Sequence, residues 1–82
     1  MAWILMAGCD GFGNDVYVAS DIVFTNYDEA YAEGIAITKK AVSNFSKSEY
    51  QKQAKFAKKY DAASYEGGGP DYYAVPVKVT IR

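Results

Sequence analysis

The sequence predicts an α+β fold: a two-layer sandwich of order ββααβ, with a three-stranded, mainly antiparallel sheet and two helices on one face. Two observations predict it. Apolar and polar side chains alternate in the second and last predicted strands, and two capping boxes in the middle each precede a stretch with helical spacing. With 82 residues and no long linker, the chain is expected to form a single compact domain, residues 1–82.

The first two strands are predicted to form a hairpin. Residues 2–8 are a continuous apolar run, residues 9–14 are rich in turn formers, and residues 15–24 alternate. The strand order stays open: a first strand that is apolar on both faces argues for the centre of the sheet, but that order would make its pairing with the last strand parallel. If both helices cover one face, either Trp3 and Leu5 or their neighbours would point to an uncovered face, which favours a homodimer or a bound partner.

Two helices are predicted to follow. Asn26 and Glu29 form the first capping box, and the spacing after them places Tyr31, Gly34 and Ala41 against the sheet. Residues 43–44 interrupt the helical pattern, and Ser46 with Glu49 forms a second capping box. The side chains expected to face inward from the second helix are Tyr50, Gln53, Ala54, Phe56, Ala57, Tyr60 and Ala63.

The last strand is predicted over residues 72–82, after a glycine-rich loop at residues 66–70. Tyr73, Val75 and every second residue after them are expected to point inward. Pro76 has no N–H to donate to a neighbouring strand. We therefore expect this strand at an edge of the sheet, or unpaired on one side at Pro76.

The composition argues against most catalytic and metal-binding chemistry. There is no histidine and only one cysteine, Cys9, so an internal disulfide is impossible and a structural zinc site is excluded. No serine or cysteine has a visible base, and a chain this short has little room for a deep cleft. We expect no enzyme, no cofactor, no bound metal and no membrane association, with a cytoplasmic location.

Charge is sorted along the chain. Residues 1–34 carry six acids and no base, whereas residues 35–59 carry seven lysines against the single acid Glu49. The formal net charge of −1 therefore hides two blocks of opposite sign. Such blocks bear on the choice of partner and on association rates.

The acidic block is the predicted protein-binding face, directed at a partner with a basic surface. Helix-dipole chemistry explains Asp28 and Glu29, but it does not explain Asp15 and Asp21 in a strand, where aspartate is unfavourable. An aromatic at the hairpin turn, Phe12, could anchor such a contact. The predicted partner-binding residues are Phe12, Asp15, Tyr17, Asp21, Asp28, Glu29 and Glu33.

Two alternatives remain open at this level. Lysines beside aromatics can bind phosphates and stack bases, although the sequence pI of 5.2 is low for a nucleic-acid binder. The lysines of this alternative nucleic-acid face are Lys52, Lys55, Lys58 and Lys59. The opposed charge blocks could also pair symmetric copies in a self-assembling structural protein.

In general make-up, the chain resembles the compact accessory proteins of phages and mobile elements, including anti-CRISPR proteins and other inhibitors of host complexes. The shared features are short length, a small α+β fold, a lone cysteine, many tyrosines and opposed charge blocks. The resemblance implies a viral inhibitor that acts by occluding a partner's surface. It assigns no role to any individual residue.

Overall fold

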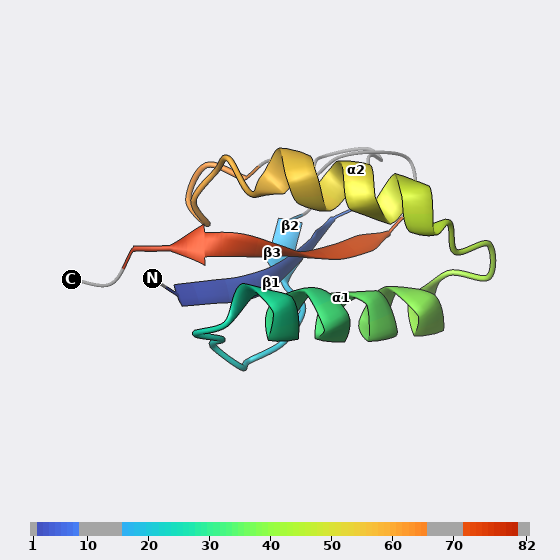
Figure 1. Ribbon diagram of the computed structural model, residues 1–82, viewed down its shortest axis with the longest axis horizontal. Helices are drawn as coiled ribbons and strands as arrows, with labels where there is room; N and C mark the ends of the chain where they lie inside the picture. The colour runs from blue at the N-terminus through green and yellow to red at the C-terminus, as the bar shows by residue number, and fades with distance from the viewer. Residues whose placement is uncertain (1, 9–15, 66–71, 81–82) are drawn as a thin grey trace.

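The chain folds into an antiparallel sheet packed with two helices, which confirms the α+β class (Figure 1). The computed structural model describes residues 2–8, 16–65 and 72–80, with the backbone alone at residues 16 and 17. The elements are β1 (Ala2–Gly8), β2 (Val16–Val18), α1 (Tyr27–Ala41), α2 (Lys47–Ala57) and β3 (Tyr73–Val79).

The strand order is β2-β1-β3, so β1 lies at the centre as its two-sided apolar pattern predicted. Its pairing with β3 is antiparallel, however, with Leu5 opposite Pro76, and the expectation of a parallel pair was wrong. In Figure 1, β3 runs in the same direction as α2 and opposite to β1.

Both helices begin where their capping boxes predicted. The side chain of Asn26 accepts hydrogen bonds from the backbone N–H groups of Asp28 and Glu29, at 2.8 and 3.2 Å. The Ser46 hydroxyl accepts one from the N–H of Glu49 at 3.3 Å. These bonds satisfy N–H groups that have no partner inside a helix, which fixes the helix starts locally.

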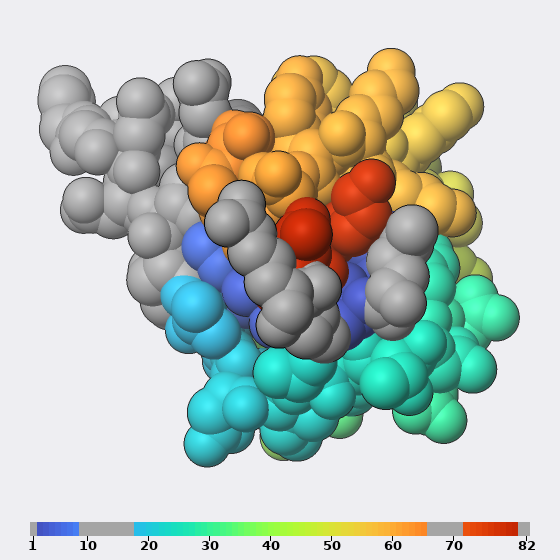
Figure 2. Space-filling view, turned by 90° about the vertical axis from the view of Figure 1, so that its left-hand side faces the viewer, coloured from blue at the N-terminus to red at the C-terminus, as the bar shows by residue number. Residues whose placement is uncertain are grey.

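The two helices pack against different sides of β1. Trp3 and Leu5 form one apolar cluster with Ala30 of α1, whereas Met6 belongs to a second cluster that includes Tyr50 of α2. Successive strand residues point to opposite faces, and the strands lie between α1 and α2 in both overall views (Figures 1 and 2). The prediction had placed both helices over one face.

This arrangement removes the uncovered apolar face on which the homodimer expectation rested. Trp3, Leu5 and Met6 are buried by the chain's own elements, and Ile4 is partly buried. In β3, Ala74 and Pro76 are as fully buried as Val75 and Val77, because side chains on both faces are covered. The central part of the sheet therefore needs no second copy to shield it.

The second strand is shorter than the predicted span of 15–24. After β2, the Ala19 N–H still donates to the Leu5 carbonyl at 2.7 Å, and the next bonds to β1 are at Phe24, whose N–H and C=O each bond to Trp3 at 2.8 Å. Between them, the Ser20 hydroxyl accepts a hydrogen bond from the Ile22 N–H, a local bond that competes with strand pairing. This bend ends the alternation and leaves Ile22 and Val23 more than half exposed.

The outer edge of β3 is closed by contacts from three other segments. The Ala74 N–H donates to the Thr38 hydroxyl at 2.9 Å, and the Tyr50 hydroxyl donates to the Ala74 carbonyl at 2.7 Å. Farther along, the Lys78 carbonyl accepts a bond from the Ala62 N–H at 2.9 Å. Pro76 lies between these positions on the same outward side, which confirms its predicted place at an edge.

Close approach of α1 to this edge depends on Gly34. A Cβ atom at this position would overlap the Tyr50 hydroxyl and would lie 2.6 Å from the Ala74 carbonyl oxygen. Gly34 and Thr38 are buried as part of this contact, and Tyr31 is partly buried. Ala41, which was predicted to face the sheet, is exposed, because α1 ends there and the chain turns toward α2.

Candidate functional site

The buried tyrosines are structural. The Trp3 and Tyr27 rings pack edge-on at a centroid distance of 4.8 Å, and the Tyr31 and Tyr50 rings do so at 5.2 Å. Burial raises the pKa of Tyr65 to about 12 and raises the pKa of Tyr50 still further. Both phenols therefore stay protonated near neutral pH, where Tyr50 serves as a hydrogen-bond donor to the sheet edge.

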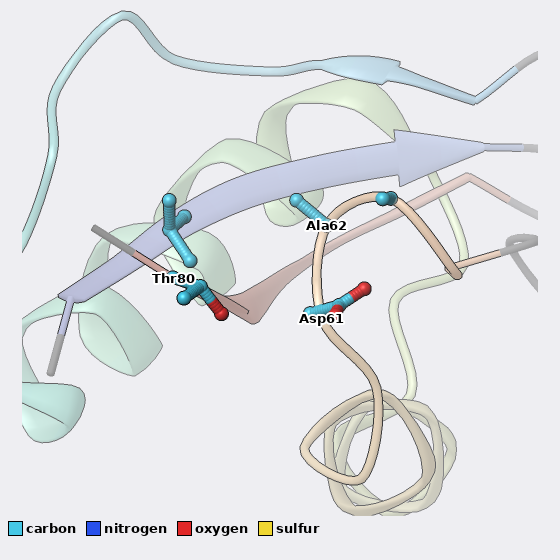
Figure 3. Close-up of a pocket in the computed structure, with 5 residues that line it drawn as sticks. Asp61, Ala62 and Thr80 are labelled. Atoms are coloured by element: carbon cyan, nitrogen blue, oxygen red, sulfur yellow. The ribbon is translucent and has the colours of Figure 1, made fainter. Parts of the chain in front are cut away.

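A pocket of about 330 Å³ lies between the segment after α2 and the end of β3 (Figure 3). Its polar side chains are Asp61 and Thr80, which come from these two segments. The Asp61 carboxylate already accepts a hydrogen bond from the Ser64 N–H at 3.1 Å. The remaining lining residues are Ala62, Ala63 and Val79. This lining offers no nucleophile paired with a base, so the pocket gives no support to a catalytic role.

The acidic face is the first surface with a binding character. It is made of the exposed acids of the second predicted strand and of α1: Asp21, Asp28, Glu29 and Glu33. Within the described residues, none of them pairs with a lysine, and the single ion pair joins Lys52 to Glu49 at 3.7 Å. Their negative charge is therefore not neutralised by the lysine block of the same molecule.

Exposed aliphatic side chains accompany these acids. Val18, Ile22 and Val23 have exposed fractions of 53%, 51% and 57%, and they fall within six residues that also contain Asp21. Single exposed apolar residues are normal on protein surfaces, but several close together mark interaction sites. The segment that carries them borders the start of α1 in Figure 2, where cyan meets teal.

The structure does not place the side chains of three predicted contact residues. Phe12 and Asp15 lie outside the described residues. Tyr17 lies in β2 opposite Ala7, and only its backbone position is described. The exposed Val18, Ile22 and Val23 were missed by the sequence analysis, because it placed all three in a regular alternating strand over residues 15–24.

The lysine–aromatic surface of α2 is the second candidate, and it consists of Lys52, Lys55, Phe56 and Lys59. These four residues line a shallow hollow of about 210 Å³. Phe56 is 48% exposed and packs against the Tyr60 ring at a centroid distance of 5.0 Å. The prediction that Phe56 faces inward was wrong. Tyr50, Ala54 and Ala57 set the buried stripe, and Phe56 lies to one side of it.

Lys58 does not share this surface. Its ammonium group lies over the ring of Tyr27, 4.4 Å from the centroid, and so bridges the end of α2 to the start of α1. Of the four lysines predicted for a nucleic-acid face, the structure therefore brings together Lys52, Lys55 and Lys59. The sequence signal that could have separated Lys58 from the others is helical phase, since it follows the buried Ala54 by four residues.

Neither a metal cluster nor a relative points to a further site. Among the described residues, no group of three or more acidic or cysteine side chains could hold a metal ion, and no helix has the length and apolar character needed to cross a membrane. No family model matches the chain, and no curated protein or solved structure matches it either.

Proposed function

We propose that the protein is a small non-enzymatic binding protein that covers part of a basic protein partner with its acidic face. The observation that carries this proposal is the mixture of exposed aliphatic side chains and unpaired acids between Val18 and Glu33. Burying Ile22 and Val23 against a partner would supply affinity through the hydrophobic effect. The acids would supply attraction at a distance and select a positively charged surface.

Occlusion is the mode of action that fits these features. A binder without a catalytic centre acts by denying its partner's surface to other molecules, and a small rigid domain can do so without a conformational change of its own. This is the activity of the phage and mobile-element inhibitors that the sequence resembles in general make-up. We propose the same class of action here, with a host complex as the target.

Zero-length carbodiimide cross-linking tests the proposal directly, because it joins a carboxylate to a lysine only where the two are in contact. The protein is captured with its partner from its native host, cross-linked and analysed by mass spectrometry. We expect links from Asp21, Glu29 or Glu33 to lysines of the partner. Links that run instead from Lys55 or Lys59 to partner carboxylates would overturn the proposal.

Charge reversal gives a second measurement on the same complex. Asp21→Lys with Glu33→Lys should slow association and flatten its dependence on salt, because complementary charge mainly sets the association rate. Lys55→Glu with Lys59→Glu changes the charge by the same amount in the opposite direction, at and just after α2, and should not slow association with a basic partner. Slowing by this variant as large as that by the acidic-face variant would show that the acidic face is not the contact.

A further inference from the structure

We infer that the lysine–aromatic surface of α2 is a binding site for single-stranded nucleic acid, separate from the acidic face. Three features of its geometry lead to this inference: an aromatic ring that is half exposed, lysines that line the same hollow as the ring, and the position of that hollow. The proposal is independent of the protein-binding function and concerns a different side of the molecule.

The exposed ring is the first feature. Phe56 leaves almost half of its surface in solvent, although three buried residues of the same helix show that α2 has an apolar stripe to bury. Its only described ring neighbour is Tyr60, also at the outer side of the helix end. A base can stack on such a ring whatever its identity, because every base has a flat π face.

The arrangement of charge is the second feature. Lys52, Lys55 and Lys59 are exposed and line the same hollow as Phe56. Among the described residues, Lys55 and Lys59 have no ion pair, and Lys52 has one weak pair with Glu49. Ammonium groups around an aromatic ring match a strand whose phosphates alternate with bases, and they do not match a neutral apolar partner.

The position of the hollow is the third feature. α2 lies at the top of Figure 2, across the sheet from the first turns of α1 at the bottom. A polyanion that approaches the outer side of α2 is therefore attracted by Lys52, Lys55 and Lys59 and repelled by the acids of α1. This polarity orients the nucleic acid without any contribution from sequence-specific contacts, since bidentate base reading favours arginine and these residues are lysines.

Fluorescence anisotropy with a labelled oligodeoxythymidine of about 12 nucleotides tests the inference, a length within the range of small single-strand sites. We expect binding by the intact protein at low salt. With three lysines in contact with phosphates, the logarithm of the affinity should fall against the logarithm of salt concentration with a slope of about −2. No binding at about 50 mM salt and high micromolar protein would overturn the proposal.

Variants at the ring separate stacking from charge. Phe56→Ala should weaken binding about tenfold, within the range measured for loss of one base–aromatic stack, while Phe56→Tyr should retain it. Phe56 is on the surface, and circular dichroism verifies that each variant is folded. If Phe56→Ala binds as tightly as the parent protein, or if a duplex of the same length binds as tightly as the single strand, the stacking site is refuted.

Charge-reversal variants show which lysines contact the phosphates of the oligonucleotide. Lys55→Glu with Lys59→Glu should abolish binding at moderate salt, whereas Lys40→Glu with Lys47→Glu makes the same change in net charge at exposed positions outside the hollow and should leave most of the affinity. Equal loss in both would show non-specific attraction and would overturn the proposal. Asp21→Lys with Glu33→Lys should not reduce oligonucleotide binding, which keeps this test distinct from that of the acidic face.

Discussion

Along β3, side chains from other elements close the outer sheet edge, whereas after β2 the chain bends and leaves aliphatic side chains in solvent. Thr38 and Tyr50 reach the outward backbone of Ala74 from two different helices. At the other edge, Val18, Ile22 and Val23 are all about half exposed. Exposed edges invite pairing with other chains, so natural proteins commonly close them. Here the β3 edge is closed by side chains, and the segment after β2 leaves aliphatic side chains exposed.

The largest expected effect on stability comes from removing the Tyr50 ring, which joins α2 to the closed β3 edge. Tyr50→Ala should lower the free energy of unfolding by about 3–5 kcal/mol, as is typical for the removal of a buried aromatic ring. Tyr50→Phe keeps the ring but leaves the Ala74 carbonyl without its donor, and should cost about 1–3 kcal/mol. Urea unfolding followed by circular dichroism measures both values.

A matched control for the hydroxyl is Tyr60→Phe, on the outer side of the same region. It should change the free energy of unfolding by no more than about 0.5 kcal/mol, as surface substitutions usually do. If Tyr50→Phe is as stable as the parent protein, the hydrogen bond to the β3 edge contributes nothing and the comparison of the two edges fails.

The Gly34→Ala substitution tests the close approach of α1 to the β3 edge, because the sign of its effect on stability depends on that approach. In an open helix, Gly34→Ala would stabilise by about 1 kcal/mol through helix propensity. Here the added Cβ atom overlaps the Tyr50 hydroxyl and presses on the Ala74 carbonyl, so we expect destabilisation of about 1–3 kcal/mol from overpacking. Thermal unfolding of Gly34→Ala beside Ala36→Ser, an exposed position of α1, measures the difference. A raised melting temperature would show that α1 does not approach the edge this closely.

The smallest expected effect on stability lies at the other edge. Ile22→Ser with Val23→Ser removes side chains that already face solvent, so the free energy of unfolding should change by no more than about 0.5 kcal/mol. The same double variant should lose much of its affinity for the captured partner, measured by biolayer interferometry. A large loss of stability would mean that these side chains support the fold, and the β2 side could not then be regarded as free for function.

Local signals made the helices predictable, and long-range geometry explains most of the errors. Asn26 and Ser46 cap their helices with bonds to residues two or three positions away, so sequence alone located both starts. The direction of β3 relative to β1 is a property of the whole topology, which no local pattern encodes. The outward position of Phe56 depends on the rotation of α2 about its axis, which the buried Ala54 and Ala57 determine only after packing.

The sequence predicted the charge of the two candidate surfaces, but not which of their side chains are exposed or lie together. Counting acids and lysines identified both blocks, because net charge by segment is a property of sequence. Val18 and Ile22 are exposed because the chain bends after β2. Lys58 is absent from the lysine–aromatic surface because it contacts the Tyr27 ring of α1. Apolar residues that a regular strand would bury therefore became the distinguishing part of the acidic face.

The central place of β1 also governs when the protein can fold during its synthesis. β1 is made first, yet its longer pairing is with β3, in which Ala2 lies opposite Val79. On the ribosome, the nascent chain therefore holds an apolar first strand that lacks this neighbour until Val79 has left the exit tunnel. Contacts this distant in sequence slow folding, and they make completion of the sheet a late event that depends on the last strand.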